Sequence, residues 1–300
     1  MTVRRLVILA LLGIRLFFHD VTVFARPEGS AGLIIAVNGD VTVAREGKNT
    51  PAIEGLVLQL GDTISVKSGG WCSGFRADGN PFRVTGPNAL VVELSSQQGV
   101  LDKVRGFIAR QIAQWSGASR SEPLVSRGVR DWKLVIVSPS TLLPASDGAV
   151  RASHPRFFWT TVPGSDSYLV TIAPEEGDEI TQTIRGHSMA PESLEAGKNY
   201  MWAVEVEKEG SHADPNWSAF RVMASEDEKQ LDEALIGLSD LEAGVLLFSA
   251  GLHEEAIYCL DAAVNTGTER RSALHWRARV LAAIGLEKDA YEDLVQTIER

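Results

Sequence analysis

The residues best suited to chemistry in this sequence are its histidines and cysteines, which are few and scattered. No two histidines stand three or four residues apart, the spacing that places two metal ligands on one face of a helix. The sequence has no Gly-x-Ser-x-Gly motif, no phosphate-binding loop and no Cys-x-x-Cys pair. We therefore predict no enzymatic activity, no metal site and no cofactor. The residues concerned are His19, His154, His187, His212, His253, His275, Cys72 and Cys259.

Spacing alone leaves a catalytic alternative open. A Ser-His-Asp triad is assembled from residues far apart in the sequence, and loss of turnover on mutating His187 or His212 would reveal one. Two cysteines are too few for a disulfide framework, so we expect free thiols. A bridge would need their Cα atoms within about 7 Å of each other.

The composition is that of a folded, acidic protein. Hydrophobic residues make up 44% of the 300 and charged residues 23%, which suits two or three domains. The formal net charge is −10, and residues 225–300 hold 16 acidic residues against 7 basic ones. Because nucleic-acid binding needs a basic face, we expect no nucleic-acid partner.

The first 25 residues predict export. A basic start, MTVRR, precedes the apolar run LVILALLGI, which is shorter than a membrane-spanning helix, and Ala25 offers a small residue for cleavage. We expect a signal peptide at 1–25 and a periplasmic or secreted bacterial protein. The alternative is an uncleaved segment that anchors the chain in the inner membrane.

Residues 26–98 predict a small antiparallel β-sandwich or roll. Apolar and polar residues alternate on both sides of Asn38-Gly39, a pair that favours a hairpin turn because both positions need positive φ. The pattern recurs about Gly61-Asp62. The succession GDVTV, LQLGDTI and FRADGN over residues 32–95 resembles a FecR-like domain. The resemblance implies an extracytoplasmic β module, and makes a surface-signalling component one alternative function.

Residues 99–130 predict an amphipathic helix followed by a linker rich in small and polar residues. We expect the apolar face of the helix at 101–115 to pack on another part of the protein. The alternative is contact with a membrane surface. The apolar residues at helical spacing are Leu101, Val104, Ile108, Ile112 and Trp115.

Residues 131–224 predict a second β module. Tyr200 enters an alternating strand just after Gly197 and six residues after Leu194, which is typical of a tyrosine corner. With Trp159 on an early strand, residues 133–223 resemble a fibronectin type III-like domain, which implies a β-sandwich. The alternating aromatic residues are expected to fill its core, and the alternative is that they stack against a glycan. These residues are Trp159, Tyr168, Tyr200 and Trp202.

Residues 225–300 contain a repeat. Four pairs of identical residues are 34 positions apart: Leu247 and Leu281, Gly251 and Gly285, Ala256 and Ala290, Leu260 and Leu294. A glycine lets the chain reverse between two helices, and an alanine lets those helices pack closely. A period of 34 resembles the tetratricopeptide (TPR) family of helical hairpins. Ser225 with Glu228 and Ser239 with Glu242 predict N-terminal caps, so one helix or two precede the repeat.

The fold class is therefore multidomain, with two all-β modules and a C-terminal helical array. We expect an exported, non-enzymatic scaffold that binds peptide or helix segments of other proteins. The TPR resemblance places that binding on the first helix of each unit, and the alternative is that Val245 and Phe248 pack on a sandwich instead. Binding of cell-wall glycan by the β modules is the alternative function. The implied partner-binding residues are Leu241, Val245, Phe248, His275 and Arg279.

Overall fold

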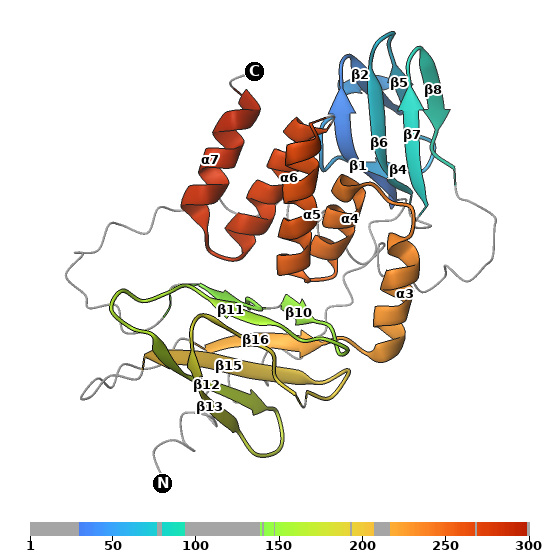
Figure 1. Cartoon of the computed structure of the whole chain (residues 1–300). Coiled ribbons are helices and arrows are strands. Elements are labelled where there is room, and N and C mark those ends of the chain that lie inside the picture. The colour runs from blue at the N-terminus through green and yellow to red at the C-terminus, as the bar shows by residue number, and fades with distance from the viewer. Residues whose placement is uncertain are drawn as a thin grey trace.

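A computed structural model describes residues 30–76, 80–93, 139, 141–146, 148–192, 194–206, 217–267 and 269–298. The predicted signal peptide and the predicted helix at 101–115 lie outside the described residues. The structure has three parts: an N-terminal sandwich (30–92), a middle sandwich (142–223) and a helical unit (225–298). The helical unit lies between the two sandwiches (Figure 1).

The N-terminal sandwich consists of two four-stranded antiparallel sheets, with strand orders β4-β1-β6-β7 and β3-β2-β5-β8. Its core includes Ile34, Leu58, Ile64 and Cys72. The predicted antiparallel β architecture is confirmed. The strands are β1 (Ser30–Asn38), β2 (Val41–Arg45), β3 (Lys48–Pro51), β4 (Val57–Gln59), β5 (Thr63–Val66), β6 (Trp71–Arg76), β7 (Pro81–Thr85) and β8 (Asn88–Val91).

The two predicted hairpin turns of this sandwich are wrong. β1 and β2 belong to different sheets, and so do β4 and β5. Asn38-Gly39 and Gly61-Asp62 are therefore corners where the chain passes from one sheet to the other. Gly39 has a φ of 76°, and a Cβ there would lie 2.9 Å from the Cα of Gly70. Glycine is required at position 39 for two reasons: the backbone at Gly70 lies too close for a side chain, and φ is positive.

The middle sandwich packs a five-stranded sheet, β10-β16-β15-β12-β13, against a three-stranded sheet, β14-β11-β9. The tyrosine corner is confirmed, because the Tyr200 hydroxyl accepts a 2.9 Å hydrogen bond from the backbone N–H of Glu195. The strands are β9 (Leu142–Leu143), β10 (Gly148–Val150), β11 (Phe157–Trp159), β12 (Ser167–Pro174), β13 (Ile180–Arg185), β14 (Ser188–Met189), β15 (Asn199–Val206) and β16 (Trp217–Val222).

The helical unit contains two hairpins, α4–α5 and α6–α7, preceded by a separate helix, α3. Gly251 and Gly285 have φ values of 81° and 83°, which is why the repeat keeps glycine at both turns. Ala256 and Ala290 are buried, as expected for close helix packing. The helices are α3 (Ser225–Leu235), α4 (Asp240–Ser249), α5 (His253–Thr266), α6 (Arg270–Ala283) and α7 (Glu287–Ile298).

Only one of the two predicted caps is present. Ser239 caps α4, and its backbone N–H donates a 2.9 Å hydrogen bond to the carboxylate of Glu242. α3 instead has Ala224 at its N-cap position and no side-chain cap. The Glu228 carboxylate, expected to complete that cap, contacts the middle sandwich instead.

We expect Gly244→Val to destabilise the helical unit. A Cβ at Gly244 would lie 2.6 Å from the Cγ of Leu260, which is buried between α4 and α5. Overpacking of this kind costs about 1–3 kcal/mol, which urea denaturation would measure. Ala282→Val, on the exposed side of α6, is the control for helix propensity. Equal losses in the two variants would contradict the close approach of α4 and α5.

Candidate functional site

The helical unit is joined to both sandwiches by one continuous apolar cluster. This cluster contains Leu33, Ile35 and Phe75 of the N-terminal sandwich, Ala149 and Met223 of the middle sandwich, and buried side chains of the helices. Strand β1 is buried on both faces, because Ile34 lies in the core of its own sandwich while Leu33 and Ile35 contact the helices. The N-terminal sandwich is therefore packed on the helical unit as one core.

Polar contacts of α6 accompany the first interface, that between the helical unit and the N-terminal sandwich. The indole Nε1–H of Trp276 donates a 2.8 Å hydrogen bond to the carbonyl oxygen of Ile35. The hydroxyl of Ser272 lies 3.1 Å from the carboxylate of Glu54. At the end of this contact, the guanidinium of Arg83 pairs with Glu269 at 2.8 Å.

The residues predicted to bind a partner are divided between α4, in the shared apolar cluster, and α6. Leu241 and Val245 are buried in the shared cluster, and Phe248 is half-buried against it. His275 and Arg279 are half-buried on α6, where a Cβ at Gly55 would meet the Arg279 guanidinium at 2.8 Å. The N-terminal sandwich thus reaches part of the face that the TPR resemblance implied, at Arg279, and a partner role for these five residues stays a prediction.

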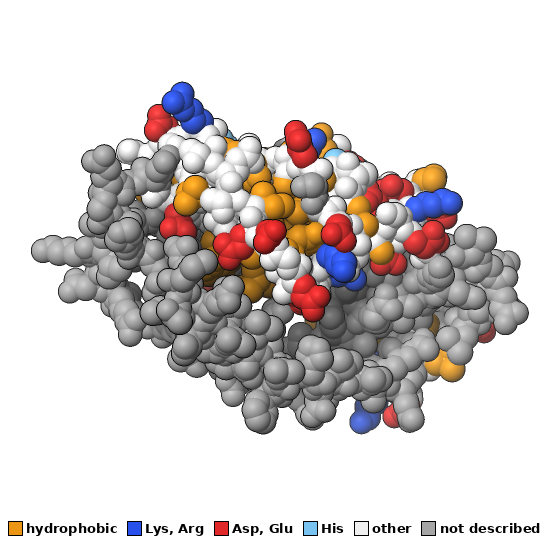
Figure 2. All heavy atoms as spheres, turned by 90° about the horizontal axis from the view of Figure 1, so that it is seen from below, with side chains coloured by type: hydrophobic (Ala, Val, Ile, Leu, Met, Phe, Trp, Pro, Cys, Tyr) orange, Lys and Arg blue, Asp and Glu red, His pale blue; other side chains and the backbone are white. Residues whose placement is uncertain are grey.

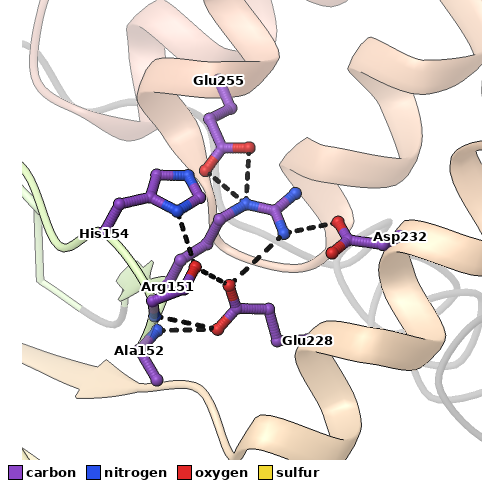
Figure 3. Close-up of polar contacts among 7 residues, drawn as sticks. Arg151, Ala152, His154, Glu228, Asp232 and Glu255 are labelled. Atoms are coloured by element: carbon purple, nitrogen blue, oxygen red, sulfur yellow. Dashed lines mark hydrogen bonds and ion pairs between the residues drawn. The ribbon is translucent and has the colours of Figure 1, made fainter.

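The second interface joins the helical unit to the middle sandwich through Arg151, whose side chain is 6% exposed (Figure 3). Its Nε lies 2.9 and 2.8 Å from the two carboxylate oxygens of Glu255 at the start of α5. Its Nη1 donates a 2.7 Å hydrogen bond to Asp232 on α3. Burial by itself lowers the pKa of the Arg151 guanidinium, but these carboxylates outweigh burial and raise it.

Glu228 on α3 completes this cluster. Its carboxylate accepts hydrogen bonds of 2.9 and 3.2 Å from the backbone N–H groups of Ala152 and Ser153, and it also contacts the Ser153 hydroxyl. Nearby, the backbone N–H of Ala149 donates a 2.9 Å hydrogen bond to the carbonyl of Gly251, in the turn between α4 and α5. Sequence reasoning missed this interface, because Arg151 and Glu255 are 104 positions apart.

A cleft of about 180 Å³ opens beside this network, between the middle sandwich and the start of α5. Arg156, His253 and Glu254 are among the residues that line it. Burial raises the pKa of the Glu254 carboxyl, and the nearby Arg156 opposes that effect. The cleft thus carries charges of both signs.

Each interface also contains a histidine with one buried ring nitrogen that has no hydrogen-bond partner. The Nδ1 of His253 lies in the second interface, 3.3 Å from where a Cβ at Gly148 would stand. The Nε2 of His275 lies in the first interface. Burial lowers the pKa of both imidazoles, and at His275 the charges of Arg279 and Arg271 lower it further while Glu54 opposes them.

We expect the folded protein to lose stability as the pH falls below about 6.5. The unfolded histidines take up protons near that pH, whereas the folded ones do so only at lower pH, so acid favours the unfolded state. The stability contribution is present above pH 6.5 and is lost through the interval below it. Urea midpoints at pH 7.5 and 5.5 would measure the loss.

The control for this pH dependence is a histidine at an exposed position. His253→Phe with His275→Phe is expected to flatten the dependence, whereas His187→Gln, at an exposed position, is expected to leave it unchanged. An unaltered slope in the double variant would show that other groups cause the loss.

The other residues considered for chemistry are mostly buried or dispersed. Both thiols are free, and burial raises the pKa of Cys72 to about 12. The described residues contain no group of three or more histidine, cysteine or acidic side chains placed to hold a metal ion. The four aromatic residues considered for glycan stacking lie in the core of the middle sandwich. His19 and His212 lie outside the described residues.

The described surface is mixed in character. Seen from below, acidic side chains are scattered among apolar ones on the part of this face that the structure describes (Figure 2). Within the described ranges, no helix combines the length and apolar character needed to cross a bilayer.

Comparison of the sequence with protein-family models gave no match. Comparison with curated proteins gave none either. Among solved structures, the fn3 domain of the human collagen alpha-1(XX) chain is similar, with 20% identity over 29% of this chain and 86% of that domain, at a TM-score of 0.25. The chain therefore has a weak fibronectin type III-like structural neighbour, and its β modules are followed by a helical region. The FecR-like and TPR resemblances stay predictions.

Proposed function

We propose that this protein is an exported, non-enzymatic scaffold whose helical unit holds two β modules in a fixed orientation for binding other proteins. The observation that carries the proposal is the apolar cluster that contains residues of all three parts. A chain of independent modules does not need such a cluster, because each sandwich already has a core of its own. A fixed orientation suits a partner that contacts more than one module.

The buried positions of Leu241 and Val245 direct partner binding to other surfaces of the helical unit and of the sandwiches. A truncation near Ser225 is therefore a poor test, because it would expose the apolar face of β1 along with removing the helices. Binding of glycan through the middle sandwich would need rings other than Trp159, Tyr168, Tyr200 and Trp202, which are buried.

The test compares full-length proteins in intact cells. Wild type, Arg151→Met and the surface control Lys67→Met are cross-linked, and the proteins attached to each are identified and quantified. We expect Arg151→Met to lose recovery of partners that wild type and Lys67→Met retain, because the variant loosens the second interface. Full recovery by Arg151→Met would contradict a scaffold that depends on fixed orientation. Location in the cytoplasm would contradict export.

A further inference from the structure

One outer strand of the middle sandwich, β13, has a free edge. The five-stranded sheet has the order β10-β16-β15-β12-β13, in which β10 lies beside the helical unit and β13 is at the opposite end (Figure 1). Among the described strands, β13 pairs with β12 alone, and this pairing covers all six of its residues without a bulge. The other edge of β13 therefore presents a row of backbone N–H and C=O groups that no described strand pairs.

β13 also lacks the features that protect an outer strand from pairing with another chain. Such strands are usually short, or carry proline or lysine. The other outer strands of this protein follow that rule: β3 holds Lys48 and Pro51, β7 begins at Pro81, and β4, β8, β9, β10 and β14 have at most four residues. β13 is longer than these five strands, contains no proline or lysine, and consists mainly of isoleucine and threonine, which favour strands. Of the described outer strands, it is the best suited to accept a further strand.

The sequence of β13 shows which strand fits that edge. Residues 180–184, Ile-Thr-Gln-Thr-Ile, read the same in both directions about Gln182, with Glu179 directly before them and Arg185 directly after them. Two antiparallel copies related by a two-fold axis at Gln182 therefore place every residue of this run opposite one of the same type. The same arrangement places Glu179 opposite Arg185 at both ends. Cross-strand pairs of β-branched residues, of threonines and of opposite charges all stabilise a sheet.

The two faces of β13 suit this pairing as well. The isoleucines at the ends of the run are half-buried and pack against the core of the middle sandwich. Because side chains alternate along a strand, the two threonines lie on the opposite, exposed face together with Glu179 and Arg185, which are both exposed. In the paired form, the isoleucines of the two copies meet on the inner face, and the two ion pairs form on the outer face.

We infer that this protein forms a two-fold symmetric dimer through β13, which joins the two five-stranded sheets into one continuous sheet. The occupant of the free edge is the β13 strand of a second copy, because the chain itself supplies a strand that matches the edge in residue type and in charge. One pairing closes both edges, so the assembly stops at two copies. The inference goes beyond the proposed function and does not depend on it.

Sedimentation equilibrium of the full-length protein, up to millimolar concentration, tests the dimer. We expect a reversible monomer–dimer equilibrium in wild type. Gln182→Lys places two like charges opposite each other on the two-fold axis and should weaken dimerisation at least about tenfold. Asn49→Lys adds the same charge on β3, another exposed outer strand, and should leave dimerisation unchanged. Both positions are exposed, so the circular dichroism spectra should stay near that of wild type.

Charge reversal tests the predicted ion pairs. Glu179→Arg and Arg185→Glu each bring like charges together at both ends of the dimer, and each should weaken self-association at least about tenfold. An equimolar mixture of the two variants restores opposite charges at both ends. We therefore expect the mixture to form a heterodimer about as tightly as wild type forms its dimer. An effect of net charge alone would not produce this recovery.

Cysteine substitution tests the register. Residues directly opposite each other in an antiparallel pair have Cα atoms about 4.5–5.5 Å apart, a separation that a disulfide can span. Gln182 is opposite its own copy, so Gln182→Cys should form an intermolecular disulfide under mild oxidation. Thr181→Cys is the matched control, because the two substituted positions then lie diagonally, about 7–8 Å apart, and should not cross-link.

Four outcomes would overturn the inference. Wild type that stays monomeric throughout the concentration range would leave the edge to a strand of another protein. Dimerisation that Gln182→Lys does not weaken would place the contact elsewhere in the chain. Failure of the mixed charge variants to associate would exclude the paired ends, and cross-linking of Thr181→Cys in preference to Gln182→Cys would exclude the register.

Discussion

Replacing Arg151 by methionine is expected to cost about 3 kcal/mol of unfolding free energy. Removing one partner of a buried ion pair typically costs about 3–5 kcal/mol, because it leaves an uncompensated charge. The lower end applies here, since the Asp232 side chain is 60% exposed and can be hydrated. Glu228 keeps its two backbone N–H donors in the variant and so adds less to the loss. Urea denaturation of the full-length chain would measure the change.

Two further variants serve as comparisons: one separates charge from geometry at Arg151, and the other is a control at an exposed ion pair. Arg151→Lys keeps a positive charge but loses the planar donor group that spans Glu255 and Asp232, so we expect an intermediate loss. Lys67→Met breaks an ion pair whose side chains are 76% and 54% exposed, and should cost at most about 1 kcal/mol. Hydrogen exchange in Arg151→Met should quicken in α3 and β10 before the N-terminal sandwich. A loss no larger than that of Lys67→Met would show that the buried network contributes little.

The local features of this fold follow from the sequence because they depend on neighbouring residues. The 34-residue repeat predicted both helical turns, since only glycine easily adopts the positive φ found at Gly251 and Gly285. The tyrosine corner was predictable for the same reason, because Tyr200 bonds to a backbone group only five residues away.

Features that depend on distant parts of the chain were missed. Asn38-Gly39 looks like a hairpin turn by every local criterion, yet the strands on either side of it pair with others in separate sheets. The run Leu33–Ala36 did carry a signal of the first interface. Four consecutive apolar residues in a strand indicate burial on both faces, whereas a strand with one solvent face alternates. Nothing local to Arg151 indicated its acidic partners, which are supplied by two helices far along the chain.

The double burial of β1 leads to the second large effect, which we expect from Trp276→Ala. This side chain is fully buried in the cluster shared by the helices and the N-terminal sandwich, and its indole N–H is bonded to the Ile35 carbonyl. Truncating a buried tryptophan costs about 3–5 kcal/mol, through lost apolar burial and the cavity that forms. The unpaired carbonyl of Ile35 adds to that cost. Urea denaturation would again measure it.

Trp276→Phe is the conservative comparison, because it keeps an aromatic ring in the core and removes the hydrogen bond. Tyr258→Ala is the surface comparison and should change stability by no more than about 0.5 kcal/mol. If the sandwich and the helices share one core, wild type unfolds in a single transition at this interface. In Trp276→Ala, α6 and β1 should then unfold separately, so that hydrogen exchange of their backbone amides reports two different opening free energies. Simultaneous unfolding of α6 and β1 in Trp276→Ala, with a loss of unfolding free energy below about 1 kcal/mol, would mean that this contact contributes little to stability. The modules would then not be held in a fixed orientation, and the scaffold proposal would be wrong.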